Sequence, residues 1–319
     1  MNPDLTLQNI RLSQIDFDDY SYTISPEHET VVDETLKKSL ARYGILHPPI
    51  IRENNSGFYS IAAGRKRLLA ASLLYPENAC TCLVIPVRIP EISVFHILLE
   101  EIQLTRQLTA VERAIFLQKI TGILDETQIT KEFLPRLGLA ANPFVIKQTV
   151  KLLELEDYIL QSIHYGNVNE AVARGFIPLP AQDRKILFEI ITSLRLSASY
   201  QKKILSICRE LAGRENIDIA ALLDDDEVGQ ILHHKDANPP QKTKKLMTWL
   251  SGKYMPRSRQ AEKEFKRFTM AMQLPPNVSI EHTPFFEDDS MTLSITYTNR
   301  KSLQHAWEKI KNATHSKDN

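Results

Sequence analysis

A cluster of cations directly follows a glycine in one stretch of the chain. The cluster comprises Gly64, Arg65, Lys66 and Arg67. Residues 58–63 before it are mostly apolar and predict a short strand, and apolar residues at helical intervals after it predict a helix. Cations oppose the dipole at a helix N-terminus, so this arrangement costs stability unless an anion binds among them. The stretch therefore predicts a phosphate site, because backbone N–H groups and cations meet there, with a solvated basic turn as the alternative.

The elements around this turn predict a small mixed α/β domain. Residues 7–16 alternate as in a strand, and apolar residues at helical spacing predict a helix capped by Ser25 and ended by Gly44. Residues 45–52 form a loop that leads into a strand, and Cys82 to Arg88 predict another strand. A further helix is expected over residues 92–103.

Three motifs in this region resemble those of ParB-type partition proteins. They are Gly44-Ile-Leu-His-Pro-Pro-Ile-Ile-Arg52, Ala63-Gly-Arg-Lys-Arg-Leu-Leu-Ala-Ala71, and Glu100-Glu-Ile-Gln-Leu-Thr-Arg-Gln-Leu-Thr-Ala-Val-Glu112. The resemblance covers about the first 180 residues and includes the order of the motifs. It implies the ParB/sulfiredoxin-like fold for the N-terminal domain. It also implies a nucleotide site, because ParB proteins bind CTP with Mg²⁺ and close as clamps on DNA.

The resemblance also assigns residues to that site. Gly64, Arg65, Lys66 and Arg67 would hold the phosphates. The sugar and base would lie near Gly44, His47 and Pro48, with Arg106 of the third motif also at the nucleotide. The metal would be held by Glu100 or Glu101.

Three departures from the family pattern bear on activity. His47 replaces a Gln, and Arg65 replaces a Glu, which makes the loop more cationic. The metal-binding Asn of the family is Glu101 or Ile102 here, depending on the register of the third motif. We therefore expect nucleotide binding, and at most slow CTP hydrolysis.

A helix-turn-helix order follows the third motif. Thr109 and Glu112 predict a capping box that opens a helix. Residues 128–137 predict a short helix, Gly138 a turn, and Asn142-Pro143 the start of a second helix. Its end, Lys151-Leu-Leu-Glu-Leu155, resembles the end of the ParB recognition helix. The candidate DNA-binding residues are Asn142, Lys147, Gln148 and Lys151.

The alternative for this region is a helical packing domain without specific readout. Pro135 interrupts the first helix, and the turn looks longer than that of the family. Few outward lysines are available to neutralise phosphates.

Composition bounds the class of protein. Lys plus Arg equals Asp plus Glu at 39 each in 319 residues, and Gly is scarce at 10. No apolar run has the length of a membrane span, and the start of the chain does not resemble a signal peptide. Three cysteines do not complete a zinc site, so buried thiols are expected. These features predict a cytoplasmic protein, and the resemblance predicts association with the nucleoid.

The remaining chain predicts helices to about residue 235, a linker at 236–241, and an α-β-β-α module. The fold class is therefore α+β and predominantly helical. Three domains are expected: a ParB-like nucleotide-binding domain at 1–106, a helical domain with the helix-turn-helix at 107–236, and a dimerisation module at 241–319.

Positive charge is concentrated beside the last module. Residues 242–267 hold nine cations and two anions, a net charge of +7. Two strands alone make too small a sheet to be stable, so pairing of two copies is expected to complete it. We predict that residues 241–319 form a homodimer whose basic surface binds DNA without regard to sequence, with a solvated basic helix as the alternative.

The leading functional hypothesis is a ParB-like DNA-binding partition protein, acting as a CTP-gated DNA clamp in chromosome or plasmid segregation. The resemblance implies a ParA-type ATPase as a further partner. Two alternatives stay open. One is a partner-binding adaptor whose nucleotide and DNA functions have decayed. The other is a nuclease-like enzyme of the ParB/sulfiredoxin fold.

Overall fold

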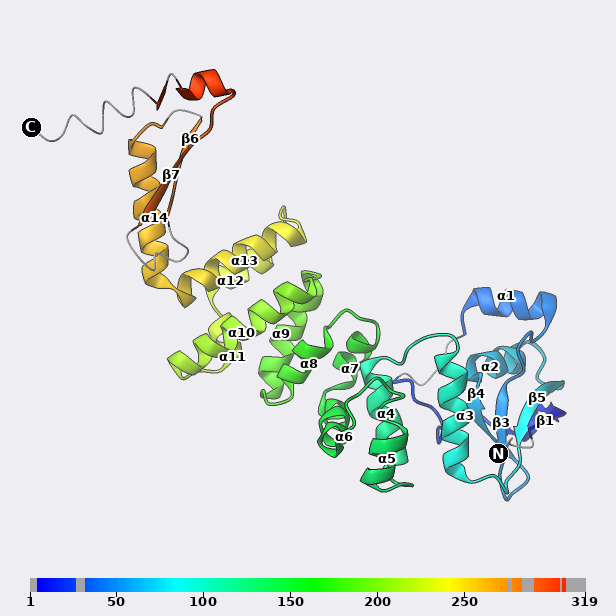
Figure 1. Ribbon diagram of the computed structural model, residues 1–319. Helices are drawn as coiled ribbons and strands as arrows, with labels where there is room; N and C mark the ends of the chain where they lie inside the picture. Colours follow the sequence, from blue (N-terminus) through cyan, green and yellow to red (C-terminus); the bar gives the residue numbers. More distant parts are fainter. Residues whose placement is uncertain (1–4, 27–31, 275–276, 283–289, 305, 308–319) are drawn as a thin grey trace, which may run out of the picture. The chain divides into compact units, whose positions relative to one another are not determined.

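The computed structural model describes residues 5–26, 32–274, 277–282, 290–304 and 306–307. The chain divides into two compact units, Met1–Leu205 and Ser206–Asn319 (Figure 1). Helices account for 56% of the chain, and the larger of its two sheets is mixed and five-stranded. The predicted fold class, α+β and predominantly helical, is confirmed.

The five-stranded sheet forms the centre of the first part of the chain. Its strand order is β1-β5-β3-β4-β2. The pairs β1–β5 and β3–β4 are antiparallel, whereas β3–β5 and β2–β4 are parallel. The elements are β1 (Thr6–Arg11), β2 (Ile15–Asp16), α1 (Glu34–Tyr43), β3 (Ile50–Glu53), β4 (Tyr59–Ala63), α2 (Arg65–Leu74), β5 (Ala79–Ile85) and α3 (Glu91–Gln103).

Alternate residues of the central strands enter two different cores. Ile51 and Ile61 pack with Leu68 of α2 on one face of the sheet. Their neighbours Ile50 and Ala62 pack on the other face, with Phe95 of α3. This is the two-residue period of a strand buried on both faces. The sheet therefore fixes α2 and α3 on opposite sides of β4.

The second of these cores continues beyond the predicted boundary at residue 106. It includes Phe116 of α4 (Ala110–Ile120) and Phe133. The ring centroid of Phe116 lies 5.7 Å from that of Phe95 and 5.6 Å from that of Phe133. The predicted division into three domains stays a prediction.

Two local predictions for the N-terminal region were wrong. The predicted strand at 7–16 is split by a 3₁₀ turn, Leu12–Gln14, so that β1 and β2 lie at opposite edges of the sheet. The first helix is not capped by Ser25. It begins at Glu34, where the Asp33 side chain accepts a hydrogen bond from the Thr35 N–H. Gly44 ends this helix as predicted, with a φ of 71°.

Helices make up the rest of the first unit, and the last of them, α10, continues into the second. Both the Thr109–Glu112 capping box and the Asn142 cap are confirmed. The predicted helix at 128–137 is shorter and lies earlier, because Pro135 has no N–H to continue it. The helices after α4 are α5 (Glu126–Glu132), α6 (Pro143–Val150), α7 (Asp157–His164), α8 (Glu170–Phe176), α9 (Ala181–Ser193) and α10 (Ala198–Glu215).

The second unit contains the predicted α-β-β-α order. Its sheet pairs β6 and β7 antiparallel, and residues 300–304 are helical. Of the predicted linker at 236–241, residues 236–238 lie outside helices and strands, but residues 239–241 are helical. Asn238 and Gln241 form a capping box, and Pro239 begins a helix whose buried face includes Leu246 and Leu250. The elements are α11 (Ile219–Leu223), α12 (Asp226–Leu232), α13 (Pro239–Tyr254), α14 (Pro256–Ala271), β6 (Val278–His282) and β7 (Met291–Ile295).

Within the described part of the chain, no helix is both long enough and apolar enough to cross a membrane. Cys80, Cys82 and Cys208 are buried free thiols, as the sequence predicted.

Candidate functional site

A cavity of about 530 Å³ lies where β4 turns into α2. Its walls come from residues 22–25, the β4–α2 turn, the end of α3 and the segment that leads into α4. Its volume lies within the usual range of small-molecule and cofactor sites. Six of the predicted nucleotide- and metal-binding residues line it: His47, Gly64, Arg65, Arg67, Glu101 and Arg106.

One guanidinium joins all three sequence motifs. Arg67 Nη1 donates a hydrogen bond to the carbonyl of His47, and Nη2 lies 3.9 Å from Glu101 Oε1. Gly64, with a φ of 87°, lies directly beneath this side chain. A Cβ at Gly64 would lie 2.9 Å from Arg67 Nη2, so a side chain at this position would displace the end of Arg67. The positive φ is the feature that favours glycine in this turn.

Arg65 has a different environment. It is 6% exposed, and its guanidinium donates to the carbonyls of Phe17 (2.6 Å) and Asp19. It also lies 4.4 Å from the ring centroid of Tyr20. The Arg65 side chain therefore holds the loop that leads into the cavity wall. Its predicted contact with phosphate stays a prediction.

Two further cations hold the same loop. Lys119 of α4 donates to the Tyr20 carbonyl at 3.0 Å, and burial lowers the pKa of this lysine. Arg52 of β3 donates to the hydroxyl of Tyr22, whose pKa burial raises. Cations from three separate elements thus fix residues 17–22 beside the cavity.

Arg106 and Glu112 form a bidentate pair at the cavity. Their N–O distances are 2.7 and 2.6 Å, and the Glu112 side chain is 2% exposed. Burial by itself would raise the pKa of Glu112, but hydrogen bonds from Arg106 and from the Thr109 N–H hold it below its usual value. The sequence assigned Glu112 only to the capping box. The sequence could have indicated that Glu112 also pairs with Arg106, because this arginine lies only six residues before it.

The structure separates the other predicted residues from this cavity. Gly44 and Pro48 line a second cavity of about 320 Å³, together with Cys80. Glu100 pairs with Arg136 at 2.6 Å. Lys66 is exposed on α2 and is not among the lining residues. The assignments of these residues to the nucleotide or metal stay predictions.

The lining groups fit a phosphorylated ligand with a hard cation. The first turn of α2 directs N–H groups and the positive end of its dipole towards the β4–α2 turn, beside Arg67. Glu101 is 40% exposed and lies at the cavity, so its carboxylate is available as a ligand. Mg²⁺ is commonly held by one or two carboxylates together with substrate phosphates. Among the described residues there is no group of three metal-binding side chains that would hold an ion without the ligand.

Helix α6 has one buried side and one exposed polar side. Ile146 and Thr149 are buried, at 2% and 1% exposure. All four predicted DNA-binding residues are exposed: Asn142, Lys147, Gln148 and Lys151. The Asn142 side chain accepts a hydrogen bond from the Phe144 N–H and so caps the helix. Lys147 pairs with Glu126 of α5 at 3.2 Å.

Phe144 lies on the same exposed face and was missed in the sequence. Its side chain is 62% exposed, although the other large apolar residue nearby, Ile146, is buried. Positions 144, 147, 148 and 151 share one side of a helix. The signal was an aromatic residue one turn before the lysine on the predicted outward face.

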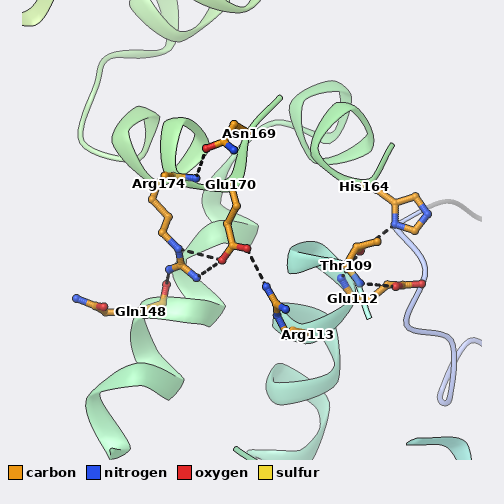
Figure 2. A network of polar contacts seen from close by, with 9 residues as sticks. Thr109, Glu112, Arg113, Gln148, His164, Asn169, Glu170 and Arg174 are labelled. Carbon is orange, nitrogen blue, oxygen red and sulfur yellow. Dashed lines mark hydrogen bonds and ion pairs between the residues drawn. The ribbon is translucent and has the colours of Figure 1, made fainter. Parts of the chain in front are cut away.

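Figure 2 shows a network of polar contacts that joins α4, α6 and α8. Arg113 of α4 donates to Glu170 of α8 at 2.8 Å, and Arg174 donates to the same carboxylate at 2.8 Å. Arg174 also donates to the backbone carbonyl of Gln148 at 3.0 Å. At the start of α4, Thr109 Oγ1 lies 3.1 Å from His164 Nδ1.

Curated relatives of this chain are nucleoid occlusion proteins. The protein of Bacillus cytotoxicus is 27% identical over 186 residues, 56% of this chain and 60% of the relative. That of Halalkalibacterium halodurans is 31% identical over 164 residues, 50% of this chain and 54% of the relative. Nucleoid occlusion proteins are members of the ParB family, so the resemblance to ParB-type proteins is confirmed. The chain spans less than two thirds of the length of these relatives. No protein-family model matches it.

Solved structures of ParB proteins superpose on parts of the chain. ParB from Caulobacter crescentus, C-terminally truncated and complexed to the centromeric parS site, covers 62% of this chain and 98% of its own, with 18% identity and a TM-score of 0.34. The same protein complexed with CTP-gamma-S covers 58% and 98%, with 20% identity and a TM-score of 0.24.

Proposed function

We propose that this chain is a nucleoid-associated, DNA-binding protein of the partition class whose pocket binds CTP with Mg²⁺. One observation carries the proposal: the Arg67 guanidinium brings together His47, Gly64 and Glu101, one from each of three motifs. CTP is the nucleotide that the resemblance to ParB-type proteins implies. The nucleoid occlusion proteins that match this chain support the same class.

Each group at the pocket has a role that its chemistry permits. Arg67 and the first N–H groups of α2 bind phosphate oxygens. Glu101 contributes a carboxylate to Mg²⁺, which when bound neutralises phosphate charge. Arg106 lines the cavity and is held in one orientation by Glu112, so it can contact the ligand with little loss of side-chain freedom.

The exposed face of α6 binds DNA in this proposal. Lys147 and Lys151 contact phosphates, and Gln148 contacts a base edge in the major groove. Without DNA, Lys147 pairs with Glu126, and in the complex a DNA phosphate replaces Glu126 as its partner.

The second unit pairs two copies of the chain. Met291 and Leu293 of β7 and Trp307 are 55%, 59% and 58% exposed, and a two-stranded sheet does not bury them by itself. The homodimer then closes on DNA as a nucleotide-gated clamp, and a ParA-type ATPase is a further partner. In sedimentation of the full chain, Leu293→Asp should convert the dimer into monomer. A wild-type chain that sediments as a monomer at micromolar concentration would exclude this part of the proposal.

The test of the pocket is nucleotide binding by calorimetry. Binding of CTP, ATP, GTP and UTP is measured in the presence of Mg²⁺, with and without DNA. The proteins are wild type, Arg67→Ala and Lys66→Ala. CTP should bind best, and only Arg67→Ala should weaken it strongly, because Lys66 does not line the cavity. Negligible heat for all four nucleotides would contradict the proposal.

One observation favours a second candidate. Arg65, Arg67 and Arg106 already contact acceptors within the chain. In an adaptor without nucleotide function, these cations would serve only to hold the loops together. The two candidates differ in the same experiment, because an adaptor of this kind shows no preference among nucleotides and no effect of Mg²⁺.

A further inference from the structure

Glu170 is bound by arginines from both sides. Its Oε2 accepts a hydrogen bond from Arg113 Nη2 at 2.8 Å, and its Oε1 accepts from Arg174 Nη2 at 2.8 Å and Nε at 3.3 Å. Arg113 belongs to α4, whereas Glu170 and Arg174 are one turn apart on α8 (Figure 2). The three residues are termed the Glu170 cluster below.

The cluster also reaches the last turn of α6. Arg174 Nη1 donates to the backbone carbonyl of Gln148 at 3.0 Å, across 26 residues of sequence. Carbonyls in the last turn of a helix carry partial negative charge, so a cation is favourable there. The Arg174 guanidinium therefore binds two groups: the Glu170 carboxylate, which Arg113 connects to α4, and a carbonyl at the carboxyl end of α6.

We propose that the Glu170 cluster consists of positioning residues that set the orientation of α6 for reading DNA bases. This inference rests on the proposed function of α6. The apolar contacts of Ile146 hold α6 against the core, but such contacts are not directional. The Arg174–Gln148 bond has a defined direction, and it fixes the backbone beside the exposed Gln148 side chain. Hydrogen bonds to base edges require that placement, whereas phosphate contacts tolerate shifts.

The exposure of the cluster separates this role from simple stabilisation. The side chains of Arg113, Glu170 and Arg174 are 20%, 35% and 32% exposed. Partly exposed ion pairs contribute little to the free energy of folding. The cluster should therefore affect the geometry of α6 more than the stability of the chain.

The full chain offers a matched control. Arg184 pairs with Glu156 at 2.6 Å, with side-chain exposures of 17% and 28%, and contacts the Leu179 carbonyl at 2.6 Å. This pair resembles the Glu170 cluster in chemistry, but the contacts of Arg184 are to α7 and residue 179 and not to α6. Loss of Arg184 should remove a comparable ion pair without changing base readout.

The experiment first selects a preferred duplex from a random-sequence DNA library with wild-type protein. Affinities for that duplex and for a scrambled one are then measured across a salt series for Arg174→Ala, Arg174→Lys, Glu170→Gln and Arg184→Ala. Arg174→Ala should lower the ratio of the two affinities by about tenfold, the size expected when one base contact is lost. Its salt slope should match wild type, because the phosphate contacts remain. Arg184→Ala should keep the wild-type ratio.

Hydrogen exchange without DNA supplies a second readout. The amides at the end of α6 should exchange faster in Arg174→Ala than in wild type or Arg184→Ala. If Arg174→Ala does not fold, Arg174→Lys provides the test, since lysine keeps the charge but cannot span both acceptors. Unchanged affinity ratios and unchanged exchange would overturn the inference and leave the proposed function intact. A wild-type protein that selects no sequence would instead contradict base readout by α6, and the inference with it.

Discussion

The pocket at Arg67 and the exposed face of α6 both offer cations to a phosphorylated ligand, but they hold them differently. In the pocket, Arg67 and Arg106 are fixed by a carbonyl and by a buried carboxylate. Lys147 of α6 and Lys151, which directly follows this helix, are exposed to solvent, and Lys147 forms an exposed pair with Glu126. The first site is formed before the ligand arrives, whereas the second obtains its order from the ligand.

In the proposed function, this difference corresponds to the size of the partner, a nucleotide in the pocket and a DNA duplex on α6. A small ligand makes few contacts, so the site must lose little side-chain freedom on binding. A duplex supplies many phosphates along a surface, and release of its counterions drives binding even when the side chains are mobile beforehand. We therefore expect single substitutions to matter most in the pocket, and combined substitutions to matter most on α6.

The largest effect should come from the combined alanine substitution of Lys147, Gln148 and Lys151. Loss of two phosphate contacts and one base contact should lower DNA affinity by roughly a hundredfold at moderate salt. Fluorescence anisotropy with the selected duplex measures it, and the salt slope should become shallower by about two contacts. DNA retention equal to wild type would remove α6 from the DNA-binding surface.

In the pocket, Arg67→Ala should weaken CTP binding by about tenfold or more. A charge-assisted contact contributes about 1.5–3 kcal/mol, and this side chain also joins His47 to Glu101. Calorimetry measures the affinity, with Lys66→Ala as the matched cation outside the cavity. Equal losses in the two variants would mean that general positive charge, rather than a formed site, binds the nucleotide.

The effect of Glu112→Gln on stability measures how strongly the Arg106–Glu112 pair holds the cavity wall without a ligand. Removing the charge that pairs with Arg106 should lower the free energy of unfolding by about 1 kcal/mol at pH 7, since Arg106 is itself half exposed.

The pH dependence of this difference has a defined sign. The folded-state pKa of Glu112 is held below its ordinary value of 4.5, so its stabilisation is fully present above that value. The stabilisation is lost as the pH falls through the lower, folded-state pKa. Thermal unfolding of both proteins from pH 7 to pH 3 measures this. A difference that grows as the pH falls would contradict the assigned charge.

The smallest effect should follow Phe144→Ala. Its exposed ring suits apolar contact with a thymine methyl group in the major groove. We expect about a threefold loss of affinity for a site with thymine at one position. Replacing that thymine by uracil should lower the affinity of wild type by the same factor and leave the affinity of Phe144→Ala unchanged. If Phe144→Ala instead loses the same affinity for the thymine and the uracil duplex, Phe144 does not contact the methyl group.

The sequence determined those features that depend on neighbouring residues. Gly64 and the helix that begins at Arg65 were predicted, and so were the Thr109–Glu112 box and the Asn142 cap. Each is set by backbone conformation or by hydrogen bonds over a few residues. The resemblance to ParB-type proteins likewise implied that His47, Arg67 and Glu100 or Glu101 belong to one site, and His47, Arg67 and Glu101 do line one cavity.

Tertiary structure decided which of several adjacent polar side chains reached the cavity. Glu100 and Glu101 were equal candidates, but successive residues of a helix point about 100° apart, so the rotation of α3 on the sheet sends Glu101 to Arg67 and Glu100 to Arg136. Arg65 and Arg67 lie two apart on α2 and likewise diverge, one to the loop at Phe17 and the other to His47. The packing of apolar faces fixes these rotations, and the partners come from distant segments. The sequence near each residue therefore does not show which side chain reaches the cavity.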